Sequence, residues 1–485
     1  MKEIFTLSAP ERVGISQAAV DCFVSDTQEM GLPIHSILLL RHGQLVCERY
    51  CAPYDKNTLH RVYSVSKSFV ALAIGLLVGE GRLSVHDRVS DYFPERLPPD
   101  PDPLLAETTV EQLLTMSPPF SDGEYDSLSG DPVENFFRAK ATHPAGTIFS
   151  YNAASPAVLT ALVERLTGES MLEYMRPRLL DPIGVSPEVW CVGMPCGGSW
   201  GASGILCTPR DLARIGLLLL NDGAWEGRQL LSAQYVRAAC GKRIDSDGDN
   251  TSTETDCGYG YFIWRTRNNG FAFLGMGCQV LLCLPDKEIV LVTTGDTQSI
   301  RGGSDAMLHS FWNTVYASAC GKPVSGCGAA PALRLPLPLG GGSGHAPAPG
   351  ILDRDISMEP NPMGILRMRF HRTEAGILWL YENRTGKHQL LFGQGQLLSQ
   401  EFPEDHYYST QLKQHGDLHY LCQAGGTWSD PATFLARVYI TDVNVGTGKM
   451  TFRFQRERVS IYMAAFAEFF LTEYQGFGWG RFDEK

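Results

Sequence analysis

The sequence lacks any Cys-x-x-Cys pair, although 13 of its 485 residues are cysteines. The two cysteines that lie closest together, Cys47 and Cys51, are spaced for neither a zinc knuckle nor a thiol redox motif. Scattered cysteines in an odd number predict free apolar thiols in a reducing compartment. We therefore expect no metal site in this chain.

Long apolar segments are also absent. The longest uncharged apolar run, Phe69 to Val78, is about half the roughly 20 residues of a membrane span. The first residues, Met1 to Thr6, contain no basic stretch followed by an apolar run, so no secretory signal is expected. These absences predict a soluble cytoplasmic protein with no membrane partner.

Positive charge is scarce as well. Lysine and arginine total 41 against 53 aspartates and glutamates, which gives a net charge of −12. An acidic chain is repelled by a phosphate backbone, and this argues against nucleic acid as a partner. Apolar residues make up 44% and charged residues 19%, the balance of a globular protein with a substantial core.

The first part of the chain has the pattern of an α+β domain. Residues 36–51 predict a hairpin with a turn at His42-Gly43, and strands are expected again between residues 261 and 294. Helices are expected between them, over residues 64–79, 156–167 and 209–220. The sheet would be antiparallel and would pair the first hairpin with the late strands.

A change of composition marks a linker and a second domain. Residues 326–350 are rich in proline and glycine, which predicts a domain over residues 1–325, a linker over 326–350 and an all-β domain over 351–485. The second domain would be a small antiparallel barrel or sandwich. Its expected strands cover residues 366–370, 377–381, 389–392, 434–440, 450–455 and 459–463.

Ser64-Val65-Ser66-Lys67 begins the helix expected over residues 64–79. Residues i and i+3 lie on one helix face, so the Lys67 amine can reach the Ser64 hydroxyl. The positive end of the helix dipole favours a developing anion at Ser64. A serine hydroxyl is a weak nucleophile until a base takes its proton, and a lysine in apolar surroundings can be that base. The alternative is a solvated helix start with a capping serine.

Two further segments could complete such a site. Phe149-Ser150-Tyr151-Asn152-Ala153 precedes a helix and would present the Tyr151 hydroxyl from a loop, whereas a core tyrosine is the alternative. Phe273-Leu274-Gly275-Met276 opens a strand region. Its glycine would let a substrate lie against the strand edge, with a backbone N–H pointing at an oxyanion. A β-bulge or tight bend is the alternative there.

Together, these three segments resemble those of the penicillin-recognising serine hydrolases. This family includes class C β-lactamases, low-molecular-weight DD-peptidases, and their esterase and D-aminopeptidase relatives. The resemblance covers about residues 10–320 and implies a β-lactamase/transpeptidase-like domain, an antiparallel sheet with a helical cluster. The C-terminal part resembles the small β domain appended to some cytoplasmic serine hydrolases of this group. The segments that resemble those of the family are residues 61–69, 79–94, 145–152, 200–204 and 208–213.

The resemblance implies a role for each motif residue. Ser64 would be the nucleophile that accepts the acyl group, and Lys67 would take or share its proton. Tyr151 would protonate the leaving group and then activate water. The backbone N–H groups of Ser64 and Met276, beside Gly275, would form the oxyanion hole. Whether Lys67 or Tyr151 is the acylation base stays open, and these steps need no metal or organic cofactor.

Two departures from the family pattern bear on the substrate. The second motif is often Tyr-x-Asn, whereas here Asn152 follows Tyr151 directly and either points elsewhere or takes over the substrate contact. The third motif is usually Lys-Thr-Gly or His-x-Gly, and here Phe273 stands in that place as a candidate apolar contact. The missing lysine normally binds a carboxylate. We therefore expect a small-molecule ester or amide substrate, and an esterase, peptidase or amidase rather than a true β-lactamase.

Several alternatives stay open. The same acyl-enzyme could pass its acyl group to an alcohol or amine, as an acyltransferase does, or the domain could be a non-catalytic ligand-binding sensor. Ser199 lies in a G-x-S-x-G pattern, but no strand directly precedes it as a nucleophile elbow requires. His415 and His419 lie among expected strands and turns and are interpreted as surface histidines. The sequence also leaves a homo-oligomer open.

Overall fold

Two hydrophobic cores divide the chain into two units. The structure is a computed structural model, and it describes residues 5–121, 130–194, 196–246, 254–338, 344–404, 420–468 and 470–484. The first unit comprises residues 1–30, 34–297 and 302–334, and the second comprises residues 31–33, 298–301 and 335–485. The main division, near residue 335, falls inside the segment expected to be a linker. The domain limits 1–325 and 351–485 stay predictions.

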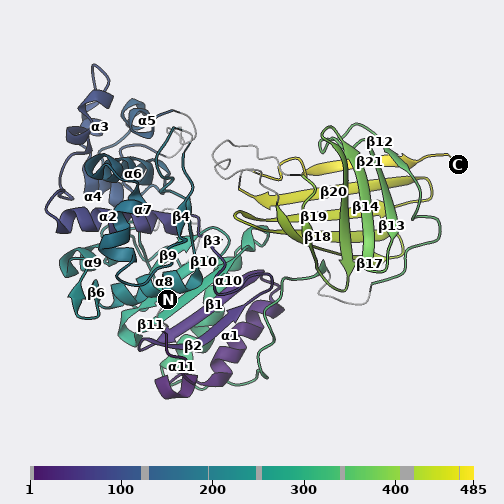
Figure 1. The fold of residues 1–485 in the computed structure, drawn as a ribbon, viewed down its shortest axis with the longest axis horizontal. Coiled ribbons are helices and arrows are strands. Elements are labelled where there is room, and N and C mark those ends of the chain that lie inside the picture. Colours follow the sequence, from purple (N-terminus) through teal and green to yellow (C-terminus); the bar gives the residue numbers. More distant parts are fainter. Residues whose placement is uncertain are drawn as a thin grey trace. The chain divides into compact units, whose positions relative to one another are not determined.

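A six-stranded antiparallel sheet forms the centre of the first unit (Figure 1). Its strands run in the order β2-β1-β11-β10-β9-β8. β1 pairs with β11 in a register that places Leu38 opposite Val292. The expected pairing of the first hairpin with the late strands is therefore confirmed. The strands are β1 (Ile34–Arg41), β2 (Gln44–Tyr50), β8 (Trp264–Arg265), β9 (Phe271–Gly275), β10 (Gln279–Leu284) and β11 (Ile289–Gly295).

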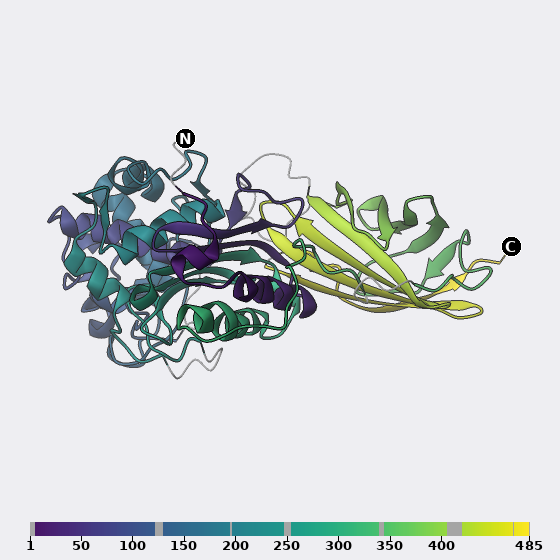
Figure 2. The ribbon, with the colours of Figure 1, turned by 90° about the horizontal axis from the view of Figure 1, so that it is seen from below.

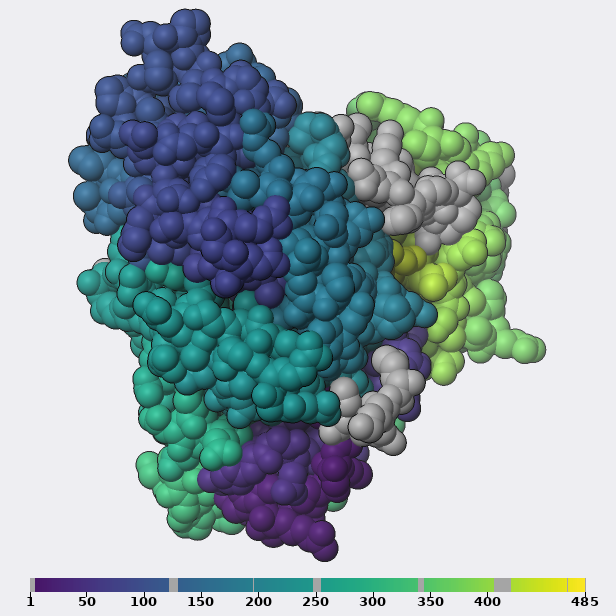
Figure 3. Space-filling model, turned by 60° about the vertical axis from the view of Figure 1, so that its left-hand side comes forward, coloured from purple at the N-terminus to yellow at the C-terminus, as the bar shows by residue number. Residues whose placement is uncertain are grey.

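Helices from both ends of the first unit cover this sheet. α1 (Gln17–Glu29) packs against α10 (Gly303–Phe311), and Figure 2 shows them side by side on one face. α8 (Pro209–Leu220) packs on β1, β10 and β11. In the space-filling view, the purple N-terminal residues accordingly lie against the green residues near 300 (Figure 3). The sheet therefore holds together segments from opposite ends of the unit.

A cluster of helices surrounds α2 (Val65–Gly79), which contacts α6, α7 and α9. Every residue of α2 from Val65 to Leu77 is buried, as its apolar sequence predicts. The other helices are α3 (Pro103–Ala106), α4 (Val110–Leu114), α5 (Pro132–Arg138), α6 (Ala154–Thr167), α7 (Met171–Met175), α9 (Ala233–Cys240) and α11 (Ala317–Ala319). Small strand pairings link the loops: β3 (His60–Arg61), β4 (Trp190–Cys191), β5 (Ile205–Cys207), β6 (Ala224–Trp225) and β7 (Arg228–Gln229). The start of α2 is thus anchored in the core.

The second unit is a β-barrel, one of the two architectures expected from its sequence. Neighbouring strands are antiparallel, and a parallel pairing of β15 with β17 closes the sheet. Aromatic side chains such as Trp379, Phe434 and Phe452 fill its interior. The strands are β12 (Ile356–Met358), β13 (Arg367–Arg372), β14 (Gly376–Asn383), β15 (Gly386–Gln394), β16 (Leu398–Glu401), β17 (Leu421–Asp430), β18 (Thr433–Thr441), β19 (Val445–Phe454), β20 (Arg458–Ala467) and β21 (Gly476–Phe482). All six expected strands are present.

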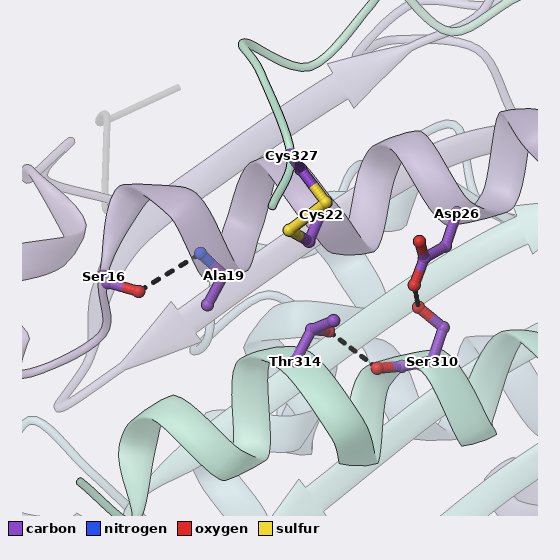
Figure 4. Close-up of a disulfide and its surroundings, with 7 residues drawn as sticks. All are labelled: Ser16, Ala19, Cys22, Asp26, Ser310, Thr314 and Cys327. Atoms are coloured by element: carbon purple, nitrogen blue, oxygen red, sulfur yellow. Dashed lines mark hydrogen bonds between the residues drawn. A yellow bond between two sulfur atoms is a disulfide. The ribbon is translucent and has the colours of Figure 1, made fainter. Parts of the chain in front are cut away.

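The prediction that all cysteines are free is wrong for two of them. Cys22 on α1 forms a disulfide with Cys327, 305 residues later, and the other eleven cysteines are free (Figure 4). The two segments meet because α1 packs beside the last helices of the unit, where Ser16 N–H donates to Ser318 Oγ at 2.9 Å. The spacing of the cysteines along the sequence gives no indication of a disulfide between such distant residues.

Two further expectations concern the membrane and the histidines. Among the described residues, no helix combines the length and the apolar character needed to cross a membrane. His415 and His419, interpreted above as surface residues, lie outside the described residues. The expectation about them therefore stays a prediction.

Candidate active site

Ser64 and Lys67 lie at the start of α2. Ser64 is the N-cap residue, and Lys67 follows one turn later. Lys67 Nζ donates to Ser64 Oγ at 3.0 Å and to the backbone carbonyl of Ala202 at 2.8 Å. Lys67 is only 6% exposed, so its amine meets the serine hydroxyl in a shielded place. This contact is short enough for proton transfer between the two side chains.

The chain reaches Ser64 through a strained turn. Tyr63 has a φ of 47°, a left-handed conformation that is uncommon for residues other than glycine. The N–H groups of Val65 and Ser66 then bond back to the carbonyls of Val62 and Tyr63, at 3.1 Å and 2.9 Å. Within the described part of the chain, the N–H of Ser64 donates to no other group. That N–H is therefore available to an oxygen bound beside the hydroxyl.

Tyr151 lies in the loop before α6, with its ring toward Lys67. The Lys67 Nζ is 5.0 Å from the centroid of the Tyr151 ring. The ring stacks on Trp264, with centroids 5.5 Å apart and planes 25° apart. Burial raises the pKa of the neighbouring Tyr259 well above its usual range, and the nearby Tyr151 raises it further. The structure thus brings Ser64, Lys67 and Tyr151 together.

The turn between β9 and β10 approaches Ser64 from the sheet. A Cβ built on Gly275 would lie 2.3 Å from the carbonyl oxygen of Val62, so only glycine allows this approach. Met276 follows, and no described residue accepts a hydrogen bond from its backbone N–H. The unused N–H groups of Ser64 and Met276 therefore lie on adjacent segments, which is the arrangement that an oxyanion hole requires.

Two residues expected to contact the substrate are buried instead. Asn152 is 2% exposed, its Oδ1 accepts from the N–H of Ser155 at 2.8 Å, and its Nδ2 donates to the carbonyl of Ser150. Asn152 therefore holds the start of α6. Phe273 has no exposed surface and packs in the core of the first unit. Neither side chain offers a surface to a substrate in this structure.

A family model described as Beta-lactamase matches residues 21–299, which is more than half of the chain. The chain belongs to the beta-lactamase family. The match spans the site from Ser64 to Met276. It confirms the resemblance to the penicillin-recognising serine hydrolases and the fold that the resemblance implies.

Relatives of this beta-lactamase-family chain include hydrolases. The 6-aminohexanoate-dimer hydrolase of Paenarthrobacter ureafaciens is 27% identical over 223 residues, which are 42% of this chain and 56% of the relative. Esterase EstB of Burkholderia gladioli is 30% identical over 175 residues, 31% of this chain and 43% of the relative. The chain spans about half the length of the curated relatives it matches. A solved structure, SurE with D-Leu, shares the fold, with a TM-score of 0.51, 18% identity and coverage of 86% of this chain and 97% of that one.

One buried cation of the beta-lactamase-family site was not among the expected residues. Arg61 has no exposed surface and donates from Nε and Nη2 to the carbonyl and hydroxyl oxygens of Ser203, both at 2.9 Å. Its guanidinium carbon lies 4.5 Å from the ring centroid of Tyr63 and 4.7 Å from that of Trp200. The carbonyl just before Ser203 is the one that accepts from Lys67. Arg61 thus holds in place the segment whose carbonyl orients Lys67. No sequence pattern indicates this role.

Ser199, the alternative nucleophile, makes a structural contact. Its Oγ donates to Glu164 Oε1 at 2.6 Å, and its backbone N–H donates to the same oxygen at 3.0 Å. The residues around it form turns and bends rather than the strand, sharp turn and helix of a nucleophile elbow. Ser199 therefore links its loop to α6.

Proposed function

We propose that this chain is a serine hydrolase that cleaves a small ester or amide through an acyl-enzyme on Ser64. The observation that carries this proposal is the 3.0 Å contact between Lys67 Nζ and Ser64 Oγ, which lies beside two unused backbone N–H groups. The curated relatives support it, because they include a 6-aminohexanoate-dimer hydrolase and an esterase.

Acylation follows from the geometry. The neutral Lys67 amine takes the hydroxyl proton as Ser64 Oγ bonds to the carbonyl carbon of the substrate. The N–H groups of Ser64 and Met276 stabilise the oxyanion that forms. Tyr151 donates its hydroxyl proton to the leaving alcohol or amine and is reprotonated by the Lys67 ammonium. The 3.0 Å separation of Lys67 Nζ and Ser64 Oγ supports Lys67, rather than Tyr151, as the acylation base.

Deacylation reverses these proton movements. The neutral Lys67 amine takes the hydroxyl proton of Tyr151, and Tyr151 takes a proton from water as the water oxygen attacks the acyl carbon. The same two N–H groups stabilise the second oxyanion. The acid product then leaves, and Ser64 regains a proton from Lys67. Lys67 is then neutral again and Tyr151 carries the proton from water, so each group ends as it began.

The substrate that we propose carries less negative charge than a β-lactam. Phe273 occupies the third-motif position at which the resemblance places a basic residue, and it is buried in the core. The cation that would bind a carboxylate is therefore missing from that position. The two curated relatives, an aminohexanoate-dimer hydrolase and an esterase, agree with an amide or ester substrate.

We also propose a cytoplasmic enzyme that acts on small molecules and binds neither nucleic acid nor membranes. Eleven free cysteines suit a reducing compartment, and the net charge of −12 opposes binding to anionic surfaces. The disulfide between Cys22 and Cys327 opposes this location. Thiol alkylation in intact cells tests it, because the cytoplasm should leave Cys22 open to alkylation, and a protected Cys22 would contradict the location.

Active-site labelling tests the proposed chemistry. Brief exposure to a fluorophosphonate or to p-nitrophenyl acetate should add one adduct to the wild type and none to Ser64→Ala, as read by intact-mass spectrometry. Ser199→Ala is the matched control and should be labelled like the wild type. Labelling that persists in Ser64→Ala would move the nucleophile, and a wild type that is never labelled would favour a binding module. Ester products formed with added methanol would indicate an acyltransferase.

A further inference from the structure

Gln279, the first residue of β10, has a buried side chain that the proposed reaction does not use. It has no exposed surface. Its Nε2 donates to the carbonyl of Met276 at 2.9 Å and to the carbonyl of Gly295 at 2.6 Å, and its Oε1 accepts from the N–H of Gly295 at 3.2 Å. One amide thus joins the tip of the β9–β10 hairpin to the end of β11.

The hairpin tip depends on this amide at one point. The tip consists of Met276, Gly277 and Cys278, and the last two have left-handed φ values of 81° and 78°. Pairing of the two strands stops at Gly275 opposite Gln279, so no ladder bond holds the tip. Residues on and just after β11 hold the carbonyls of Gly277 and Cys278. Among the described residues, only Gln279 donates to the carbonyl of Met276.

The two glycines of the turn leave the space that this amide fills. A Cβ built on Gly277 would lie 3.1 Å from Gln279 Nε2 and 3.1 Å from the carbonyl oxygen of Gly295. A Cβ built on Gly275 would lie 3.0 Å from Gln279 Cβ. Both distances are shorter than ordinary van der Waals contact, so a side chain at either position would displace the glutamine. The Gly-x-Gly of the third motif therefore encloses Gln279.

We propose that Gln279 is a positioning residue for the oxyanion hole, an inference that rests on the proposed function. The N–H and the carbonyl of Met276 flank the same Cα, so holding the carbonyl also directs the N–H toward the oxygen that becomes charged beside Ser64. An amide suits this task because it donates to two carbonyls and accepts from an N–H with one side chain. A carboxylate cannot donate, and an alkyl group removes the donor from both carbonyls.

Kinetics on a matched pair of substrates test the inference. Wild type, Gln279→Leu and Gln279→Glu are compared on p-nitrophenyl acetate and its thiono analogue. The sulfur of the thiono analogue is a weaker hydrogen-bond acceptor than oxygen, so the N–H groups of the oxyanion hole stabilise it less. We expect kcat for the oxygen ester to fall about 10- to 100-fold with KM within about twofold, because a poorly placed donor loses transition-state stabilisation. Loss on the thiono ester should be within about threefold. Equal loss on both substrates, or an unchanged kcat, would overturn the inference.

A structural readout keeps the inference separate from the proposed function. Amide hydrogen exchange of the peptide 271–284 should quicken in Gln279→Leu. It should not change in the control Gln423→Leu, which removes a buried glutamine of β17 whose Nε2 donates to Ser399 Oγ. Gln279→Asn, which shortens the side chain but keeps the amide, replaces Gln279→Leu if the latter does not fold. Exchange that stays at the wild-type rate overturns the positioning role, whereas a wild type without an adduct on Ser64 overturns the proposed function.

Discussion

Ser64 combines three chemical components within one helix turn: a hydroxyl, an unused backbone N–H, and an amine held 3.0 Å away. The left-handed conformation of Tyr63 makes this arrangement possible, because it turns the chain just before Ser64. The N–H groups after Ser64 then close the first turn of the helix, and the N–H of Ser64 itself stays available. The backbone strain at Tyr63 thus lies next to the group that would carry out the chemistry.

Replacing Lys67 with methionine should nearly abolish acylation. Methionine keeps much of the side-chain volume but cannot take the serine proton, so kcat/KM on p-nitrophenyl acetate should fall by about 10³-fold. The Ala202 carbonyl loses its donor, which should lower the free energy of unfolding by about 1–3 kcal/mol in urea titrations. The exposed Lys56→Met is the control for loss of a lysine. Acylation of Lys67→Met at the wild-type rate would contradict the role of the amine.

Motif spacing predicted which residues meet at the site but not which of them face a substrate. Ser64 and Lys67 lie together because i and i+3 share a helix face, a property of the sequence alone. The burial of Asn152 and Phe273 depends instead on the packing of α6 and of the core, which motif position does not determine. Arg61 escapes prediction for the same reason, since its partner Ser203 is 142 residues away.

At the scale of elements, β1 and β3 are joined by two buried histidines. His60 Nδ1 lies 2.9 Å from the carbonyl oxygen of Arg61, so this nitrogen carries the proton. His60 Nε2 then accepts from His35 Nδ1 at 2.8 Å, and Tyr54 stacks on His35. Burial lowers the pKa of both histidines, that of His60 to about 4 and that of His35 well below its usual value.

Acid should destabilise the first unit through this pair. A histidine with a lowered pKa in the folded state binds protons more readily when unfolded, so its stability contribution is complete above about pH 6.5 and is lost between about pH 6.5 and 4. His60→Asn keeps a donor for the Arg61 carbonyl and does not titrate. Between pH 7 and 4.5, the free energy of unfolding should therefore fall by about 2–3 kcal/mol less in His60→Asn than in the wild type.

Urea unfolding at the two pH values measures this difference. The exposed His42→Asn serves as the control and should follow the wild type closely. If wild type and His60→Asn lose the same free energy of unfolding over this pH range, the histidine pair is not the cause of the acid sensitivity.

Among the elements, alternating apolar residues predicted the barrel strands well, and glycine-rich strands were missed. β17 and β21 contain glycines, which have low strand propensity. These glycines fit because large neighbours need the room: a Cβ on Gly426 would lie 2.2 Å from the ring of Phe434. Packing against a neighbouring strand therefore selects glycine there, and a local pattern cannot show it.

At the scale of the whole molecule, the disulfide between Cys22 and Cys327 closes most of the first unit into a loop. Cys327→Ser should lower the free energy of unfolding by about 2–5 kcal/mol, because a long loop gains much freedom when it opens. kcat should stay unchanged, since no described contact joins either cysteine to the site. Denaturant titrations with and without reductant measure the loss. Cys320→Ser, an exposed free cysteine, is the control, and equal stability of Cys327→Ser and wild type would contradict the expectation.

The pairing of β1 with β11 also has a consequence for the synthesis of the chain. The partner of β1 is about 250 residues further along, and a ribosome adds roughly 5–20 residues per second, so the wait is on the order of 10–50 s. Meanwhile β1, buried along nearly its whole length in the finished sheet, has β2 on one side and an open edge on the other. Such an edge attracts other chains. The yield of active protein should therefore depend on translation speed and chaperone supply as much as on the stability of the finished fold.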